Sequence, residues 1–375
     1  LKDEGLLTDA DLSNVPHFSD EEVDFAAVGE YKEELFKKAF ACFKELPKDN
    51  PLKSELALFG KSAHWLDDYA MFMAIKKSKG GAHWLEWEKK YRKPTKSQKA
   101  VIEREFEDEI LYEKFLQWTF CRQWSQLKAY ANERDILLIG DIPIFVSGDS
   151  ADVWAEPRLF QVDSDGFPTV VAGVPPDYFS ATGQLWGNPL YDWKYHKKTN
   201  YEWWMERFKT QFLLSDIVRI DHFRGLESYW EIPADSETAL NGKWVDGPKD
   251  EFFEDEDSNY LPYNQPYNCI CYTGTHDNDT TTGWYATASE KARDKVRRYM
   301  NTDASQVSWD FIRTCFGSPA RFAIIPVQDL FCQGSDCRMN TPGKADGNWA
   351  YRMKKELLTS DVAKRLYDVT KLYGR

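Results

Sequence analysis

The fold is decided by the stretch Ile217-Val218-Arg219-Ile220-Asp221-His222-Phe223-Arg224-Gly225. Its first half is a short apolar run, and charged residues follow where the run ends. The same pattern recurs at three places, with apolar runs over 136–139 before Gly140-Asp141, 269–272 before His276-Asp277 and 322–327 before Gln328-Asp329. Such runs, separated by helical stretches, are typical of parallel strands buried on both faces in an α/β protein.

Polar residues that follow parallel strands lie together at one edge of the sheet. In a (β/α)8 barrel this edge carries the active site. We therefore expect an α/β fold of the (β/α)8 barrel type with helical insertions. A doubly wound sheet is the alternative. It normally carries a glycine-rich phosphate loop, and the sequence contains neither GxGxxG nor GxxxxGK[ST].

The first third of the chain is predicted to be helical. Apolar and aromatic residues between Tyr31 and Phe43 recur at helical spacing, and Pro47 ends that run. Two further helices are expected over 56–77 and 105–132. A basic, solvated loop is expected over 89–99.

These patterns predict two regions, a mainly helical subdomain over 1–135 and the barrel over 136–375. Within the second region, the stretch 145–193 is rich in glycine, proline and aromatic residues. We expect it to form a long active-site loop, because ordered loops of this length are more often functional than incidental.

The charge and the cysteines exclude several kinds of partner. A formal net charge of −13 argues against nucleic acid, which is bound by clustered Lys and Arg. No apolar run approaches the ~20 residues of a membrane span, so no membrane partner is expected. The seven cysteines lack zinc-ligand spacing, and we expect reduced thiols in a cytoplasmic protein without a metal.

Aromatic residues make up 15% of the sequence, and 15 of them are Trp. Most Trp and Tyr residues contribute to the hydrophobic core. Flat rings also stack on the apolar faces of sugars, so the content is compatible with a carbohydrate cleft as well. Composition leaves both interpretations open.

Asp221 is the first candidate for catalysis. Cleavage of a glycosidic bond with retention requires two carboxyl groups, one as nucleophile and one as acid and base. Asp221 follows a strand, and Arg219 lies two residues away on the same face. A nearby cation favours the ionised, nucleophilic form of a carboxylate. The structural alternative is an aspartate that caps the next helix.

A second strand end is followed by Thr275-His276-Asp277-Asn278-Asp279. An imidazole and a second acid could there hydrogen-bond sugar hydroxyls, contacts that strengthen in the transition state. A polar turn is the alternative. A metal site is not expected, because neither this segment nor Asp163-Ser164-Asp165-Gly166 has the spacing of a calcium loop.

Longer motifs resemble those of a known family. They are Asp141-Ile142-Pro143-Ile144-Phe145-Val146, Asp149-Ser150-Ala151-Asp152-Val153-Trp154, Gly173-Val174-Pro175-Pro176-Asp177, Gly183-Gln184-Leu185-Trp186-Gly187-Asn188-Pro189, Arg219 to Gly225, Gly274 to Trp284, Arg338-Met339-Asn340-Thr341-Pro342-Gly343 and Gly347-Asn348-Trp349. Together they resemble the amylomaltase or disproportionating-enzyme family, the 4-α-glucanotransferases of glycoside hydrolase family 77 in the α-amylase clan. The resemblance runs over nearly the whole chain.

The resemblance implies a role for each matching residue. Asp221 would be the nucleophile that forms a covalent glucosyl-enzyme, supported by Arg219. Asp277, with His276, would stabilise the transition state. Substrate contacts are implied for Gln184 and Trp186 on the acceptor side, for Asp149 and Asp152 near the donor sugars, and for Asn278. The implied reaction transfers an α-1,4-glucan segment from one maltooligosaccharide to the 4-hydroxyl of another, with no metal or organic cofactor.

The chain departs from the family pattern in two places. The family's first barrel strand, with its Pro-Leu-Gly-Pro and Ser-Pro-Tyr loop, has no counterpart, and neither has the Ala-Glu-Asp-Leu-Gly motif that carries the acid/base Glu. Asp221 and Asp277 are 56 residues apart, whereas three barrel units would take about 90. We therefore expect the barrel of this chain to be incomplete, with the break near Phe253–Asn259. There Glu254-Asp255-Glu256-Asp257 forms a solvated surface run and supplies no catalytic acid.

Three functions are compatible with these features. The first is a retaining 4-α-glucanotransferase. The second is a catalytically impaired relative that binds maltooligosaccharides, because it lacks the acid/base Glu. The third is a hydrolase of the same clan, which would release reducing sugar without lengthening any chain.

Overall fold

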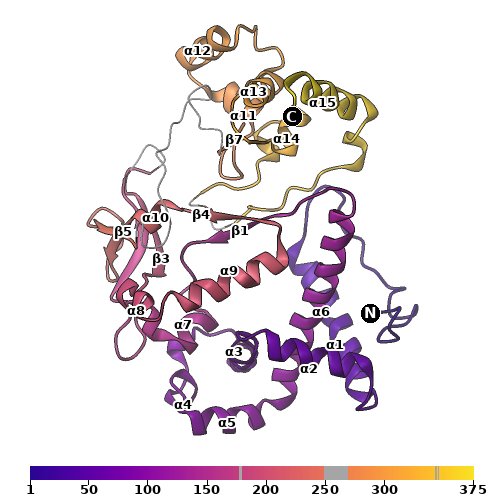
Figure 1. The fold of residues 1–375 in the computed structure, drawn as a ribbon, viewed down its shortest axis with the longest axis vertical. Coiled ribbons are helices and arrows are strands. Elements are labelled where there is room, and N and C mark those ends of the chain that lie inside the picture. The colour runs from indigo at the N-terminus through magenta and orange to yellow at the C-terminus, as the bar shows by residue number, and fades with distance from the viewer. Residues whose placement is uncertain (177–179, 249–268, 343, 345) are drawn as a thin grey trace. The chain divides into compact units, whose positions relative to one another are not determined.

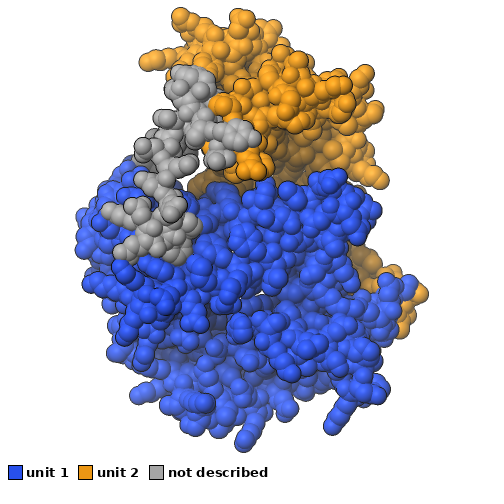
Figure 2. All heavy atoms as spheres, in the orientation of Figure 1, with its two compact units in different colours: residues 1–7, 36–255 blue, residues 8–35, 256–375 orange. Residues whose placement is uncertain are grey.

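The computed structural model describes residues 1–176, 180–248, 269–342, 344 and 346–375. The chain divides into two compact units, Leu1–Leu7 with Phe36–Asp255 and Thr8–Leu35 with Glu256–Arg375 (Figure 2). The predicted break and surface acids near 253–259 lie outside the described residues. The expected boundary after residue 135 stays a prediction.

Helices occupy the first part of the chain (Figure 1). They are α1 (Phe25–Glu45), which crosses the boundary between the units, α2 (Pro51–Ser62), α3 (Leu66–Ser78), α4 (Lys89–Arg92), α5 (Lys96–Glu105) and α6 (Glu107–Asn132). Side-chain capping explains where two of these helices begin. The Asn50 side chain accepts the Leu52 N–H at the start of α2, and Thr95 and Gln98 form a capping box on α5.

Two of the predicted helices are confirmed by α1 and α6. The single helix expected over 56–77 is wrong, because the chain leaves helical geometry at Ala63, whose φ and ψ are −94° and 82°. The break lets Trp65 pack edge-on against Phe59 and Tyr69. The loop expected over 89–99 is also wrong. It holds α4 and the start of α5, and the buried Tyr91 anchors α4 in the core.

Strands β1 (Ile139–Pro143) and β4 (Ile217–Asp221) pair in parallel, with Ile139 opposite Ile217 and Pro143 opposite Asp221. The strand expected at 217–220 is confirmed, whereas the one expected at 136–139 begins three residues later. The prediction that these strands are buried on both faces is wrong for β1 and β4. Every residue of β4 is only half-buried, and Ile139 is 46% exposed.

The described residues of the stretch 145–193 include α7 (Ala151–Ala155), β2 (Val170–Val174) and β3 (Gln184–Pro189), so this stretch contains regular secondary structure. Its part in the active site stays a prediction. Later in the chain come α8 (Trp193–Lys198), α9 (Glu202–Leu214), α10 (Arg224–Glu227), β5 (Ser228–Pro233) and β6 (Lys243–Asp246), and the strands form an antiparallel sheet in the order β3-β2-β5-β6. Sequence patterning missed this sheet because β2 pairs with β5, which lies some sixty residues further along the chain.

A large hydrophobic core lies within the first unit. It is rich in aromatic residues from α3, α7 and α9 and from the segments between them, including Phe72, Trp84, Trp154, Tyr191 and Trp204. Tyr191 stacks on Phe145, which follows β1, with 5.8 Å between the ring centroids. The Tyr191 hydroxyl donates to the Ile144 carbonyl at 2.6 Å. The core therefore fixes the chain just beyond the end of β1.

His196 is fully buried in this core, and its Nε2–H donates to the Leu159 carbonyl at 3.1 Å. Burial lowers the pKa of His196 from 6.5 to about 4. Between these two pH values the unfolded chain binds a proton that the folded chain does not. The free energy of unfolding is therefore expected to fall as the pH falls from 6.5 to about 4, by up to about 3 kcal/mol.

Urea unfolding of wild type and His196→Phe at pH 7.5 and pH 4.5 checks this expectation. The variant cannot titrate at this position, so it is expected to lose less stability between the two pH values. The same loss in both proteins would contradict the role given to His196.

The second unit contains the other parallel pair, β7 (Ile270–Tyr272) and β8 (Phe322–Ile324), which confirms the strands expected at 269–272 and 322–327. Its helices are α11 (Thr281–Thr287), α12 (Glu290–Met300), α13 (Val307–Phe316), α14 (Val327–Leu330) and α15 (Ser360–Tyr373). Trp309, Ile312 and Phe316 of α13 pack against Leu366 and Val369 of α15.

Two parallel strand pairs and one antiparallel sheet give a mixed α/β structure. This confirms the class expected from the sequence. No sheet among the described residues has more than four strands, so a closed barrel is not seen in that part of the chain.

Candidate active site

Asp221 is the last residue of β4, and Arg219 holds its side chain from the same strand. Successive side chains on a strand alternate between faces, so residues two apart share one face. The Arg219 guanidinium donates to Asp221 Oδ1 at 2.7 Å and to Asp141 Oδ2 at 2.5 Å. Asp141 stands opposite Arg219 in the β1–β4 register. One guanidinium thus orients two carboxylates at the carboxyl end of the parallel pair.

His222 continues this arrangement in a left-handed backbone conformation, with φ at 54°. Gly225 allows close packing beside His222. A Cβ at Gly225 would stand only 2.8 Å from Ile144 Cδ1 and 3.3 Å from the His222 ring. The His222 Nε2 atom is buried and has no hydrogen-bond partner among the described residues. Burial lowers the pKa of His222, and the neighbouring Asp221 opposes that effect.

Trp186, on β3, lies against His222. The two rings meet edge to face with 4.8 Å between their centroids, and the Trp186 side chain remains 37% exposed. Trp186 Nε1 donates to Gln184 Oε1 at 3.2 Å. The structure therefore brings the predicted residues Asp221, Arg219, Trp186 and Gln184 together, and we call these with Asp141 and His222 the Asp221 cluster.

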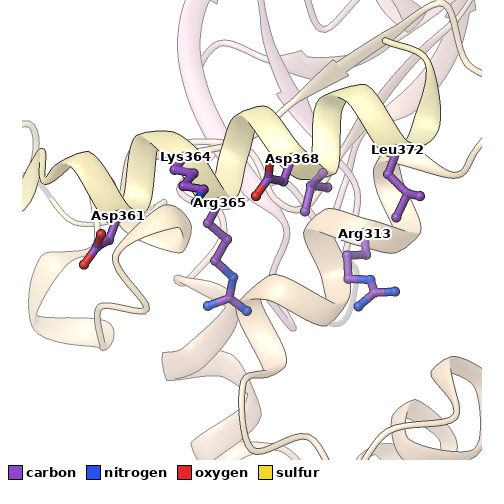
Figure 3. A pocket seen from close by; sticks show the side chains of 7 residues that line it. Arg313, Asp361, Lys364, Arg365, Asp368 and Leu372 are labelled. Carbon is purple, nitrogen blue, oxygen red and sulfur yellow. The ribbon is translucent and has the colours of Figure 1, made fainter.

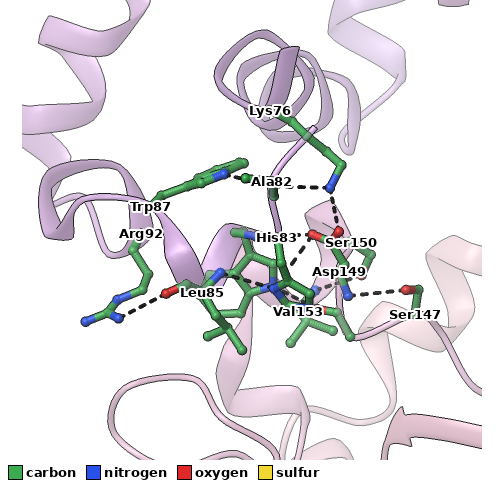
Figure 4. Close-up of polar contacts among 12 residues, drawn as sticks. Lys76, Ala82, His83, Leu85, Trp87, Arg92, Ser147, Asp149, Ser150 and Val153 are labelled. Atoms are coloured by element: carbon green, nitrogen blue, oxygen red, sulfur yellow. Dashed lines mark hydrogen bonds and ion pairs between the residues drawn. The ribbon is translucent and has the colours of Figure 1, made fainter. Parts of the chain in front are cut away.

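The other predicted residues of the first unit are held differently. The Asp149 carboxylate accepts from Lys76 Nζ at 2.5 Å and from the Trp84 N–H at 3.3 Å, so it joins the segment at residue 84 to the loop that precedes α7 (Figure 4). Burial raises the pKa of Asp152, which Arg207 opposes. Neither carboxylate hydrogen-bonds a residue of the Asp221 cluster within the described chain. Their contacts to donor sugars stay predictions.

In the second unit, polar residues gather around Asp277 just beyond β7. Asn340 Nδ2 donates to Asp277 Oδ1 at 2.6 Å, and Arg338 Nη2 donates to the Asp277 carbonyl at 2.6 Å. His276 Nε2 lies 3.4 Å from the same Oδ1, and the His276 ring lies 5.0 Å from that of Trp349. These five residues form the Asp277 cluster.

Two nearby side chains shape the backbone of this segment. Asn278 Oδ1 accepts a hydrogen bond from the Thr275 N–H at 2.8 Å, so the side-chain oxygen of Asn278 stabilises the turn. Asp329 is almost fully buried and accepts hydrogen bonds from Thr273 and Thr281 on either side of the segment. Residues 275–279 therefore form a polar turn, and this is compatible with the predicted role of Asp277 in binding sugar.

The prediction from the sequence omitted Asp141, Arg338, Asn340 and Trp349 as site residues. Asp141 ends an apolar run as Asp221 does, and that pattern could have indicated it. Arg338 and Asn340 lie 61 and 63 residues beyond Asp277, and Trp349 lies nine residues beyond Asn340. Only the two motifs in which they occur singled them out. Among the described residues, no group of three or more His, Cys, Asp or Glu side chains could hold a metal ion.

Comparison with known proteins identifies the family. A profile described as 4-alpha-glucanotransferase matches residues 1–255 and 252–359. The 4-alpha-glucanotransferase of Synechocystis is 41% identical over 426 residues, covering 100% of this chain and 84% of that protein. The chloroplastic/amyloplastic 4-alpha-glucanotransferase of Solanum tuberosum is 34% identical and is covered over 73% of its length.

Among solved structures, the amylomaltase of Streptococcus agalactiae in complex with acarbose superposes with a TM-score of 0.93. It shares 33% sequence identity, and the match covers 100% of this chain and 85% of that one. None of the helices among the described residues has the length and hydropathy needed to cross a bilayer. The chain belongs to the 4-alpha-glucanotransferase family, enzymes that transfer segments of α-1,4-glucans.

Proposed function

We propose that the chain carries out transfer between maltooligosaccharides by retaining double displacement, with Asp221 as the nucleophile. The Asp221 carboxylate attacks the anomeric carbon and the glycosidic bond breaks. The leaving 4-oxygen takes a proton from water, the shorter glucan departs, and a covalent glucosyl-enzyme remains. A 4-hydroxyl of a second maltooligosaccharide then attacks the same carbon, gives its proton to water and releases the Asp221 carboxylate. The observation that carries this proposal is the Arg219 guanidinium, which donates one hydrogen bond to Asp221 at the end of β4 and a second to Asp141 on β1.

The rest of the Asp221 cluster supports an acceptor site. Trp186 offers a half-exposed ring beside His222, and Gln184 holds the indole N–H. Such a surface suits the apolar face of a glucose unit and its hydroxyl groups. Covering the covalent intermediate with a sugar rather than water favours transfer over hydrolysis. The donor side would involve Asp149 and Asp152, and Asn278 would contact substrate in the second unit.

The proposed fold is the (β/α)8 barrel. Within each unit, the parallel pair of strands carries a candidate catalytic residue at its carboxyl end or just past it, which is where such barrels place their chemistry. We propose cytoplasmic function without a metal or organic cofactor. In support, the seven cysteines are free thiols, and the proposed chemistry requires only carboxylates.

A covalent label tests the nucleophile directly. A deactivated glucosyl fluoride should form a stable ester with the protein, and digestion followed by mass spectrometry should locate it on Asp221. A label on another carboxylate would remove Asp221 from the role. No label at all, with glucan binding retained, would favour the binding relative over the transferase.

Asp277 is proposed as the transition-state stabiliser. Asn340 and His276 both lie at its Oδ1, which leaves Oδ2 for the sugar. Asp277→Asn is expected to lower kcat about 10²–10³-fold, the usual effect of losing one preorganised transition-state contact. The KM for maltotriose should change much less. The control is Asp294→Asn on α12, because the half-exposed Asp294 side chain forms an ion pair with Arg298 at the surface. A KM effect larger than the kcat effect would contradict the assignment.

A second function, glucan binding with impaired catalysis, is favoured by one specific observation. The sequence contains no Ala-Glu-Asp-Leu-Gly motif. The family profile matches in two segments that meet at 252–255, and the alignment with the Synechocystis protein spans 426 positions against 375 residues in this chain. Both facts support the proposal that relatives carry an internal segment that this chain lacks.

A further inference from the structure

The second unit holds a pocket that shares no residue with the Asp277 cluster. A cavity of about 530 Å³ is lined by residues from the end of α12, from α13 and the loop after it, and from the end of α15. Its lining includes Tyr299, Thr302, Asp310, Arg313, Ser318 and Tyr373. None of these residues has been given a part in the reaction.

Two tyrosines give the pocket exposed aromatic surface. Tyr299 is 50% exposed and Tyr373 is 37% exposed. Gly317 makes room for the second ring, because a Cβ at that position would stand 3.2 Å from Tyr373 Cε1. A phenol ring that is half-covered by protein presents one apolar face and a hydroxyl to a ligand. Pyranose rings offer the complementary CH face and hydroxyl groups.

The polar groups of the pocket supply both donors and acceptors. Thr302 Oγ1 donates to Asp310 Oδ2 at 2.7 Å, which orients that carboxylate. The Arg313 guanidinium makes no hydrogen bond or ion pair with any described residue, so its donors are available. One carboxylate and one guanidinium in the same cavity balance each other's charge. A neutral ligand rich in hydroxyl groups fits this pair better than an anion does.

Arg375 makes the wall of the pocket rigid. Its guanidinium donates to the carbonyls of Phe316, Ala320 and Ser318 at 2.7 Å each. These bonds join the end of α15 to the loop after α13, which keeps Tyr373 beside Gly317. A wall fixed before binding loses little conformational entropy when a ligand arrives.

Arg313 also lines a smaller neighbouring pocket of about 300 Å³ between α13 and α15 (Figure 3). That pocket is dominated by charge, with Asp361, Lys364, Arg365 and Asp368 around it. Arg365 is already engaged, since it stacks over Trp309 at 4.0 Å and donates to Gln306. The smaller pocket therefore suits a neutral sugar less well than the one with the tyrosines.

We propose that the pocket lined by Tyr299, Asp310, Arg313 and Tyr373 is a surface site for α-1,4-glucan chains, separate from the catalytic residues. The inference rests on the proposed function for the class of ligand. A second attachment point on the same protein would hold a long glucan near the catalytic residues and raise its effective concentration there. Short substrates such as maltotriose would gain little from it.

Affinity electrophoresis in gels that contain glycogen tests the site on the full chain. All proteins carry Asp221→Asn, so that no turnover occurs. Tyr299→Ala and Arg313→Ala are each expected to raise the apparent Kd for glycogen about tenfold, through loss of a stacking surface and of the second attachment point. The controls are Tyr367→Ala, an exposed tyrosine of α15 outside the pocket, and Arg298→Ala on the exposed face of α12.

The outcomes separate this site from the proposed function. Tyr299→Phe should retain the glycogen affinity that Tyr299→Ala loses, which excludes general unfolding as the cause. Equal retardation of Tyr299→Ala, Tyr367→Ala and the parent would overturn the proposal, as would absence of glycogen binding in the parent. A selective loss in Tyr299→Ala and Arg313→Ala would support the site even if the chain failed to transfer glucose from maltotriose.

Discussion

Asp221→Asn is expected to abolish transfer from maltotriose, lowering the rate by about four orders of magnitude, the scale typical of losing a catalytic nucleophile. The amide cannot form the glucosyl ester, and it also loses the charge that pairs with the Arg219 guanidinium at the end of β4. Asparagine has nearly the same size as aspartate, so the cleft should keep its shape.

The matched measurements are maltotriose turnover and maltooligosaccharide binding by calorimetry. Binding should change less than about threefold, because the nucleophile contributes to the transition state more than to the ground state. Asp235→Asn, an exposed aspartate of the same unit, should behave as wild type. Retained turnover in Asp221→Asn, or a loss of binding as large as the loss of rate, would contradict the nucleophile assignment.

The second large effect concerns the leaving group. If the acid/base Glu is absent, the first step lacks a proton donor for the leaving sugar oxygen. Fluoride leaves without a proton, so α-maltotriosyl fluoride should form the glucosyl-enzyme in a step that needs no acid. We expect it to react about 10²–10⁴ times faster than maltotriose, a ratio that equals the usual contribution of general acid catalysis.

The control is a relative that carries the Ala-Glu-Asp-Leu-Gly motif, measured with the same two substrates. Its preference for the fluoride should be far smaller. A small ratio in this chain as well would mean that another group supplies the proton, and the proposed loss of the acid/base segment would then be wrong. A rate that falls at alkaline pH with maltotriose but not with the fluoride would lead to the same conclusion, because a proton donor is lost as the pH rises through its pKa.

The parts of the site that lie close in the sequence were predictable. Arg219 and Asp221 share a face because they are two residues apart on one strand, and the pattern of apolar residues located that strand correctly. Thr275 to Asp279 were expected after a strand, and β7 ends just before them. In both cases a short apolar run followed by polar residues was sufficient to predict the strand and the site residues after it.

The parts that depend on distant pairing were not predictable. The second carboxylate on Arg219 belongs to Asp141, which is brought there only by the β1–β4 register. Asn340 reaches Asp277 from a segment without regular periodicity. The Lys76–Asp149 ion pair closes a gap of 73 residues and occupies a carboxylate that the sequence assigned to a donor sugar. No single-sequence pattern records such contacts.

Incubation of the purified chain with maltotriose, with products followed by chromatography and Asp221→Asn run in parallel, distinguishes transfer from hydrolysis and checks the role of Asp221. We expect glucose together with a ladder of longer maltooligosaccharides from the wild-type chain, formed slowly, and neither product from the variant. Glucose and maltose without any longer chain would indicate hydrolysis and contradict transfer. A ladder formed equally well by Asp221→Asn would contradict the mechanism proposed for this site.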